Sequence, residues 1–286
     1  MKPRPLAIAT CGACRSDSVS YVCDSTLYVP GGILPDTIWK CDGCGTYFRG
    51  VNYDDPLVRT HFDATSYTVP EVEGQLQASR IGFFEHIIHL GSGHNRTPGP
   101  NTRILDVGAA YGHLLDLYRQ KGAECAGIEI VDWLRDRLRE KGFRAFKSVG
   151  QIPEGAVFEV ITMIDSLYYV QCPGDLLREL RRHLHPDGVL ILRVANRTPV
   201  FHALRLLRRA IPRDVFGDVK YNLSFRGVQH LLADAGYRIK RVVLNEKGKK
   251  MAMRTRWLYY KLSLLASHLT GRKLTPGMIL ICRRGE

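Results

Sequence analysis

The chain has 286 residues, of which 45% are hydrophobic and 24% are charged. These values exclude a disordered or fibrous protein and fit one globular domain with a small appendage. The apolar runs are far shorter than the roughly 20 residues of a membrane span, and the apolar patch near the start is too short for a signal peptide. We therefore expect a cytoplasmic protein without a transmembrane segment.

The formal net charge of +13 is unevenly distributed along the chain. Residues 237–286 hold 13 Lys or Arg against two Glu, so they carry +11 of this charge. Such a basic region favours a phosphate-bearing or otherwise anionic partner, and the alternative is a solvated face without a partner.

Four of the eight cysteines form two C-x-x-C pairs, Cys11 with Cys14 and Cys41 with Cys44. Each pair lets two thiolates bind one ion, and two pairs complete the tetrahedral sulfur shell that a structural zinc ion prefers. Because the protein would fill all four positions, we expect a structural zinc ribbon over residues 1–50. A redox-active dithiol is the alternative.

After the ribbon, residues 51–74 are polar and are expected to form a loop. An apolar stripe predicts a helix from about residue 73 to residue 90, and the Gly- and Pro-rich segment 91–101 ends it. We take residues 51–102 as a linker and cap helix. Beyond it, apolar strands alternate with amphipathic helices, as in a doubly wound, mostly parallel α/β sheet. The expected strands are 103–107, 125–130, 144–149, 158–164, 188–194, 238–244 and 278–282, and the expected helices are 113–121, 133–141, 174–184, 224–235 and 256–269.

The turn after the first strand of this sheet contains Gly108, Ala110 and Gly112. Glycines at such a turn let a ligand approach the backbone closely, at the carboxyl edge where open α/β sheets bind ligands. Asp106 precedes the turn, which suits a ligand with an ammonium group better than one with a pyrophosphate. Glu129, at the end of the second strand, is placed to accept hydrogen bonds from both hydroxyls of a ribose.

These motifs resemble those of the class I S-adenosylmethionine-dependent methyltransferases, and the resemblance covers residues 103–286. The acidic residue and G-x-G-x-G of that family are matched with alanine in place of the middle glycine. The segment 160–173 is similar to the family's fourth-strand motif. The resemblance implies a Rossmann-like methyltransferase domain with S-adenosylmethionine as its cofactor. The implied cofactor contacts are Asp106, Gly108, Ala110, Gly112, Glu129, Ile130 and Asp165.

Two departures from the family concern the catalytic centre. Many relatives carry a Glu-His pair where this chain has Tyr168 and Tyr169, and that His often serves as the general base. We expect Tyr169 to line the site, where it could orient the substrate or accept a proton. As a proton acceptor it would be weaker than a histidine, because a neutral phenol is a weak base near pH 7. The adenine-binding acid usually found after the third strand is also absent, and Gln151 or backbone groups are expected to substitute for it.

The ribbon joined to this fold resembles the zinc-ribbon-bearing small-molecule methyltransferases of sugar, polysaccharide and secondary-metabolite pathways. It implies methyl transfer to a hydroxyl of a sugar, glycan precursor or natural product. The arginines after the fifth strand and the basic C-terminal region are compatible with a phosphate-bearing or lipid-linked acceptor. Asn196, at the end of the fifth strand, and His202 are expected to bind this substrate. His113 and His230 are further candidates for a general base.

Three alternatives remain at this point. An RNA methyltransferase with a zinc module would use the basic region as an RNA footprint, but residues 1–50 are close to neutral and no Asn-Pro-Pro-Tyr-type motif follows the fourth strand. A non-catalytic cofactor-binding protein is disfavoured by the intact Asp106 and Glu129. Finally, the helix 256–269 either rests on an anionic bilayer through a leucine stripe or packs on the sheet, and we expect packing on the sheet.

Overall fold

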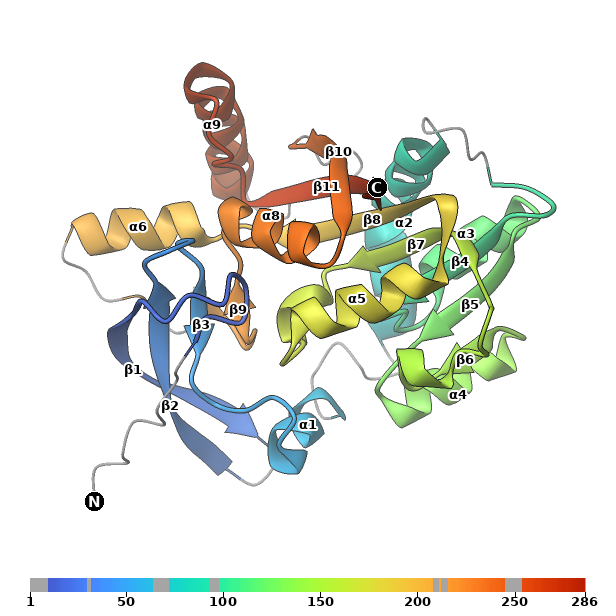
Figure 1. Ribbon diagram of the computed structural model, residues 1–286, viewed down its shortest axis with the longest axis horizontal. Coiled ribbons are helices and arrows are strands. Elements are labelled where there is room, and N and C mark those ends of the chain that lie inside the picture. The colour runs from blue at the N-terminus through green and yellow to red at the C-terminus, as the bar shows by residue number, and fades with distance from the viewer. Residues whose placement is uncertain are drawn as a thin grey trace.

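The computed structural model describes residues 10–29, 32–63, 72–92, 98–207, 211, 216–244 and 254–285. Two β-sheets organise these residues, and the smaller sheet lies beside one edge of the larger one (Figure 1). The four cysteines belong to the smaller sheet and the glycine-bearing turn belongs to the larger one.

The larger sheet confirms the predicted Rossmann-like arrangement. Its strands are β4 (Arg103–Val107), β5 (Glu124–Ile128), β6 (Arg144–Phe146), β7 (Phe158–Ile164), β8 (Leu184–Ala195), β10 (Tyr237–Val243) and β11 (Gly277–Arg284). They lie in the order β10-β11-β8-β7-β4-β5-β6. The pairs β8-β7, β7-β4, β4-β5 and β5-β6 are parallel, and β11 and β10 join antiparallel beside β8.

Helices cover both faces of this sheet, which explains why its central strands are continuous apolar runs. Neighbouring strand residues point to opposite faces: Ile104 packs in the cluster that includes Phe84 and Leu115, whereas Leu105 packs in the cluster that includes Leu177 and Leu231. The helices concerned are α2 (Glu73–Ser92) and α3 (His113–Gln120) on one face, and α5 (Pro173–His183) and α8 (Phe225–Asp234) on the other. The helices α4 (Asp132–Glu140) and α6 (Thr198–Leu206) follow β5 and β8.

The smaller sheet is a ribbon completed by a strand from the part of the chain that also builds the larger sheet. It contains β1 (Val19–Val29), β2 (Gly32–Cys41), β3 (Tyr47–Arg49) and β9 (Tyr221–Asn222), in that order and all antiparallel. The pairing of Phe48 with Tyr221 closes the sheet. The ribbon therefore shares its hydrogen bonds with a segment far beyond residue 50.

Buried charges reinforce this junction. Arg49 forms a 2.6 Å ion pair with Asp36, and both side chains are at most 1% exposed. The ammonium group of Lys220 donates to the backbone carbonyls of Arg49 and Val51, at 2.6 Å each, and burial lowers the pKa of Lys220 to about 8. Removing one partner of such a buried pair leaves an uncompensated charge, which costs about 3–5 kcal/mol.

One helix lies in a segment that we expected to be a loop. Residues 56–63 form α1 (Pro56–Asp63), and the Asp55 carboxylate accepts a 2.8 Å hydrogen bond from the Leu57 amide at its start. An acidic cap followed by Pro at the first helical position is a typical helix start. The expectation of a loop was therefore wrong, because this short signal was overlooked among polar residues.

The helix α9 (Arg254–Thr270) also differs from expectation, since its leucine stripe does not pack on the sheet. The helix stands away from the sheet in Figure 1. Its other side is held by polar contacts: the Tyr260 hydroxyl donates to the Leu244 carbonyl at 3.2 Å, and the Leu274 amide donates to Ser267 Oγ at 3.0 Å. The segment that leads back to β11 thus packs against the side of α9 that carries Tyr260 and Ser267, and the leucines on the opposite side of the helix face solvent. None of the helices within the described residues is long and apolar enough to cross a membrane.

Candidate active site and cysteine cluster

The turn between β4 and α3 has a backbone that only a few residue types adopt readily. Gly108 and Gly112 have φ angles of +80° and +76°, and Ala110 has a φ of +46°. The amides of Gly108 and Ala109 both donate to the carbonyl of Ile128, at 2.8 and 3.1 Å. A Cβ atom at Gly108 would lie 2.7 Å from the Cβ of Ser166, so glycine is required there for both conformation and space.

Glu129 connects this turn to the loop after β5. Its Oε2 accepts a 2.8 Å hydrogen bond from the Ala110 amide, and its Oε1 accepts a 3.0 Å bond from the Val131 amide. The carboxyl group is buried, and burial raises its pKa above the usual value despite the two amide donors. The next residue, Ile130, is 45% exposed, and an apolar side chain left open at this edge is available to cover a flat ligand.

Asp106 is more deeply buried at the carboxyl end of β4. The Thr162 hydroxyl donates to its Oδ1 at 2.7 Å, and burial raises the pKa of Asp106 to about 7. It lines a small cavity of about 60 Å³ together with Arg80 of α2 and His113 of α3. The burial of His113 lowers its pKa to about 4, so this imidazole is neutral near pH 7.

A larger cavity of about 680 Å³ opens at the carboxyl ends of β4, β5 and β7. Its volume lies within the range of small-molecule sites. Gly108, Ala110 and Arg80 line both this cavity and the small one. Its other lining residues include Tyr53, Asp54, Arg59, Glu129, Ile130, Lys147, Ser148, Val149, Asp165, Tyr168, Tyr169, Glu179 and Asp218.

Asp165 follows β7 and is held in an unusual conformation. Its φ is +61°, its amide donates to the Arg193 carbonyl at 3.1 Å, and its carboxylate forms a close ion pair with the Arg193 guanidinium. The next turn carries Tyr168 and Tyr169, whose ring centroids lie 4.9 Å apart. Burial, and next the charge of Asp165, raise the pKa of Tyr168 well above its usual value, so this phenol stays protonated.

The structure brings together most of the residues predicted from the sequence. Six of them line the larger cavity: Gly108, Ala110, Glu129, Ile130, Asp165 and Tyr169. Asp106 lines only the small cavity beside it. Gly112 lines neither, because it faces α4, where a Cβ atom would lie 2.7 Å from Leu138 Cδ2.

The two predicted substrate-binding residues lie elsewhere. Asn196 is buried; its amide group donates to the Lys273 carbonyl at 2.7 Å and its Oδ1 accepts from the Thr198 hydroxyl at 2.8 Å. His202 contacts Tyr47 of the ribbon, with Nδ1 3.3 Å from the hydroxyl oxygen. Neither residue lines the cavities described above, because the protein itself uses their polar groups. Of the histidines that the structure describes, none lines the larger cavity.

The predicted contact of Gln151 with adenine has a similar outcome. The Gln151 Oε1 accepts a 2.7 Å hydrogen bond from the Lys147 amide, and Gln151 is not among the residues that line the larger cavity. Ser148 and Val149 line it instead. The segment that stands in place of the usual acid therefore contributes two residues to the cavity, neither of them acidic.

Several lining residues were missed by sequence reasoning. Tyr53, Asp54 and Arg59 come from the segment between the ribbon and α2, and Arg80 comes from α2 itself. No spacing rule links these positions to the glycine turn, since they reach the cavity only through tertiary packing. The aromatic Tyr53 within a polar segment was the one local signal.

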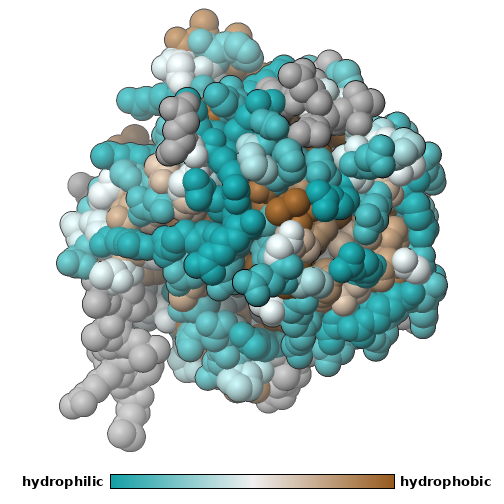
Figure 2. Space-filling view, turned by 45° about the vertical axis from the view of Figure 1, so that its right-hand side comes forward, coloured by the Kyte–Doolittle hydropathy of each residue, from teal (hydrophilic) through white to brown (hydrophobic). Residues whose placement is uncertain are grey.

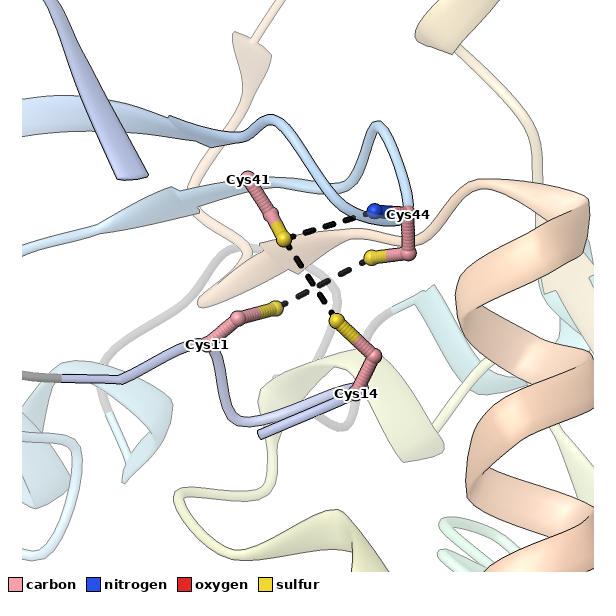
Figure 3. Close-up of side chains that lie close together, drawn as sticks. All are labelled: Cys11, Cys14, Cys41 and Cys44. Carbon is pink, nitrogen blue, oxygen red and sulfur yellow. Dashed lines mark hydrogen bonds between the residues drawn. The ribbon is translucent and has the colours of Figure 1, made fainter. Parts of the chain in front are cut away.

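The four cysteines of the two C-x-x-C pairs converge at one end of the ribbon (Figure 3). Their sulfur atoms all lie within 4.8 Å of one another, with Sγ–Sγ distances of 3.9 Å for Cys11–Cys44 and 3.4 Å for Cys14–Cys41. Zn–S bonds of about 2.3 Å in a tetrahedron require sulfurs about 3.8 Å apart. The amides of Ala13 and Cys44 donate to the sulfurs of Cys11 and Cys41, at 3.4 Å each. Distances and donors of this kind suit a metal-bound thiolate cluster.

The cysteine cluster is docked on the larger part of the protein. Ser224, the residue that caps α8, donates to the Cys44 carbonyl at 2.6 Å and accepts a 2.8 Å bond from the Gly227 amide. We call the turns Cys11–Cys14 and Cys41–Cys44 the first and second knuckles. A Cβ atom at Gly12 would lie 2.1 Å from the Tyr221 hydroxyl oxygen, so the first knuckle packs against β9 only if this residue is glycine. The Tyr221 hydroxyl of the same sheet donates to the Gln171 carbonyl at 2.9 Å, and the Tyr53 amide donates to Gln171 Oε1 at 2.8 Å. The ribbon sheet thus contacts the loop that follows Tyr169.

The fold and this site define a class I S-adenosylmethionine-dependent methyltransferase with an N-terminal cysteine-cluster ribbon. Residues 76–242 match the family described as a methyltransferase domain, and the chain belongs to this family. It is an S-adenosylmethionine-dependent methyltransferase.

Curated relatives carry the name ubiquinone biosynthesis O-methyltransferase. One from Azorhizobium caulinodans is 25% identical over 170 residues, which are 54% of this chain and 67% of that protein. One from Xanthomonas oryzae pv. oryzae is 29% identical over 125 residues, which are 39% of this chain and 52% of that protein. The chain therefore matches about half of the length of the second relative.

Solved structures share the fold. Magnesium protoporphyrin IX methyltransferase from Synechocystis PCC 6803, with bound S-adenosylhomocysteine, aligns with a TM-score of 0.53 at 17% identity, over 81% of this chain and 100% of that one. At this identity the likeness concerns the fold alone.

Proposed function

We propose that this methyltransferase transfers the methyl group to a hydroxyl of a small-molecule acceptor, such as a sugar, a glycan precursor or a natural product. The observation that carries the proposal is the cavity of about 680 Å³, which is lined both by most of the predicted cofactor contacts and by a group of aromatic residues. The O-methyltransferase names of the relatives support an oxygen acceptor. We call Gly108, Ala110, Glu129, Ile130, Ser148 and Val149 the cofactor end, and Tyr53, Asp54, Arg59, Tyr168, Tyr169 and Asp218 the acceptor end.

At the cofactor end, Glu129 would accept the ribose hydroxyls, since its carboxylate is fixed by two backbone amides and reaches the cavity. Ile130 would cover the adenine, because it is the exposed apolar residue directly after Glu129. The amino-acid part of the cofactor carries one ammonium and one carboxylate group. Asp106 and Arg80 flank the small cavity beside the glycine turn, and they offer the opposite charge to each of these groups.

At the acceptor end, the side chains would exclude water and orient the acceptor. When bound, S-adenosylmethionine supplies a methyl group on a positively charged sulfur, which the acceptor oxygen displaces in line. Tyr169, packed against Tyr168, would orient the hydroxyl of the acceptor. The hydroxyl proton would pass to Tyr169 or to a carboxylate that lines the cavity.

The cysteine cluster fits a structural zinc ion. Four sulfurs within 4.8 Å of one another, with backbone amides that donate to two of them, would fill all four ligand positions of the ion and leave none for a substrate. Cys11, Cys14, Cys41 and Cys44 would hold the ion. Its proposed role is to fix the two knuckles against β9 and the start of α8, which in turn places Tyr53 and Arg59 at the acceptor end.

The test is methyl transfer from labelled S-adenosylmethionine by the zinc-loaded protein to a panel of phenols, sugars, nucleotide sugars and RNA. Transfer to a hydroxyl compound that is lost in Tyr169→Phe and little changed by salt supports the proposal. Transfer to RNA alone, falling steeply with salt, would contradict it in favour of an RNA methyltransferase. Binding of S-adenosylhomocysteine without transfer to any member would leave the cofactor assignment intact and remove support for the acceptor class.

A further inference from the structure

An exposed apolar stripe runs along the helix α9. Leu258, Leu262, Leu265 and Leu269 recur at intervals of three and four residues, so they lie on one side of the helix. These leucines are 53–79% exposed, and the neighbouring Trp257 is 54% exposed. Figure 2 shows apolar residues at the top of the molecule, where Figure 1 places α9. Scattered exposed leucines are common, but a continuous stripe beside a tryptophan marks an interaction surface.

The charge of this segment restricts what covers the stripe. Residues 254–273 contain no Asp or Glu and five Lys or Arg: Arg254, Arg256, Lys261, Arg272 and Lys273. Pairing with a second copy would bring these cations together without any compensating acid from the helix. An anionic surface, by contrast, gains attraction from every one of them.

The position of α9 is also informative. Its returning segment is fixed to the end of β8, because Asn196 donates to the carbonyls of Lys273 and Pro276 at 2.7 and 2.8 Å. Gly277 pairs with Ala195 there. The helix therefore projects from the carboxyl edge of the parallel strands, the same edge of the sheet that carries the large cavity.

We propose that α9 docks the protein on the surface of an anionic lipid bilayer. Leucines on one side, aromatic residues at its margin and flanking Lys and Arg are the composition of a helix that lies in the headgroup region of a membrane. The stripe enters the apolar boundary while the basic residues contact the phosphates. The helix lies on the membrane and does not cross it. This proposal does not depend on the acceptor, since binding is measured without methyl transfer.

The test is flotation of the full-length, zinc-loaded protein with vesicles of pure phosphatidylcholine and vesicles that also contain phosphatidylglycerol. We expect binding to the second kind alone, weakened by salt, with a blue shift of tryptophan emission from Trp257. The double variant Leu262→Ser with Leu265→Ser should bind at least about tenfold more weakly, because two large apolar side chains no longer enter the membrane. The matched control is Tyr28→Ser with Ile33→Ser, which removes two apolar residues of similar exposure from the β1–β2 hairpin.

Every outcome decides the proposal once both variants bind S-adenosylhomocysteine like the wild type, which verifies their folding. No binding of the wild type to anionic vesicles overturns it, and so does equal loss in both double variants. Binding that Lys261→Glu abolishes but the leucine variant retains overturns the lipid docking in favour of a purely ionic contact with a polyanion. A wild-type dimer that becomes monomeric in the leucine variant overturns it in favour of a second copy.

Discussion

The substitution Glu129→Gln tests the cofactor end most directly. The wild-type carboxylate accepts hydrogen bonds from the amides of Ala110 and Val131, and the proposed ribose hydroxyls would add two more. Glutamine has the same shape but only one acceptor oxygen. Its NH₂ group must face either a backbone amide or a ribose hydroxyl that needs an acceptor. The variant therefore loses the charge and at least one hydrogen bond at an unchanged volume.

The expected loss of affinity for S-adenosylhomocysteine follows from these contacts. Hydrogen bonds to a charged group contribute about 1.5–3 kcal/mol each. A net loss of about 2–3 kcal/mol corresponds to a roughly 30- to 150-fold higher Kd. Because burial raises the pKa of Glu129, wild-type affinity should also fall with decreasing pH at a higher pH than for an exposed glutamate. The variant should lack this part of the pH dependence.

Isothermal titration calorimetry measures both effects, with Asp132→Asn as the matched control. Asp132 lies three residues farther along and its side chain is 72% exposed, where it pairs with Arg135. This control removes one nearby negative charge without touching the cavity, so its Kd should stay close to that of the wild type. If Glu129→Gln is folded and binds as tightly as the wild type, or if both variants weaken binding equally, Glu129 does not hold the ribose.

Three further predictions concern neighbouring features. Arg80→Gln should lower the affinity for S-adenosylhomocysteine by roughly tenfold, as expected for the loss of a charged hydrogen bond. Calorimetry should show unchanged affinity for 5′-methylthioadenosine, which lacks the carboxylate, and equal losses for the two ligands would contradict the assignment. Burial raises the folded pKa of Asp106 to about 7, so its contribution to stability is present at low pH and lost as pH rises from about 4 to 7. The free energy of unfolding in urea of Asp106→Asn should therefore rise relative to that of the wild type by up to roughly 4 kcal/mol between about pH 4 and pH 7. If the two proteins show the same pH dependence, the pKa of Asp106 is not raised by burial. Cys41→Ser should lose the bound zinc ion and have a Tm lower by roughly 10 °C or more. The control Cys23→Ser, outside the cluster, should keep the zinc content and the Tm of the wild type, as measured by metal analysis and thermal unfolding.

The parts of this molecule that could be predicted are those that local sequence determines. Strands β4 and β7 have the bounds expected from the sequence. A strand that is buried on both faces is a nearly continuous run of apolar residues, so the ends of the run mark the ends of the strand. Asp106 and Glu129 were found because each lies at the carboxyl end of a strand of the parallel sheet, Asp106 just before the end of β4 and Glu129 just after β5. The two cysteine pairs were found because metal knuckles require fixed short spacings.

The remaining features depend on contacts between distant segments. The strand β9 has two residues, too few for a period, and it exists because β3 offers it a partner. Arg80 and Tyr53 reach the cavity through packing that no spacing rule encodes. Asn196 directly follows β8 and His202 lies in α6, the segment expected to bind the substrate, but the polar atoms of both residues form hydrogen bonds within the protein. The helix α9 shows an apolar stripe in its sequence, yet the stripe alone does not say whether a sheet or something else covers it.

The ribbon packs against the acceptor end of the cavity, and this separates two consequences of losing the metal. Tyr53 packs with Leu27 and Val29 of the ribbon, and its hydroxyl donates to the Asp218 carbonyl at 2.6 Å. Glu129 and the glycine turn are held by hydrogen bonds at the end of β5. Disordering the knuckles should therefore raise KM for the acceptor while Kd for S-adenosylhomocysteine changes little. A ribbon that served only global stability would weaken both together, so the ratio of the two constants in a partly metal-depleted protein distinguishes a wall of the acceptor site from a general support.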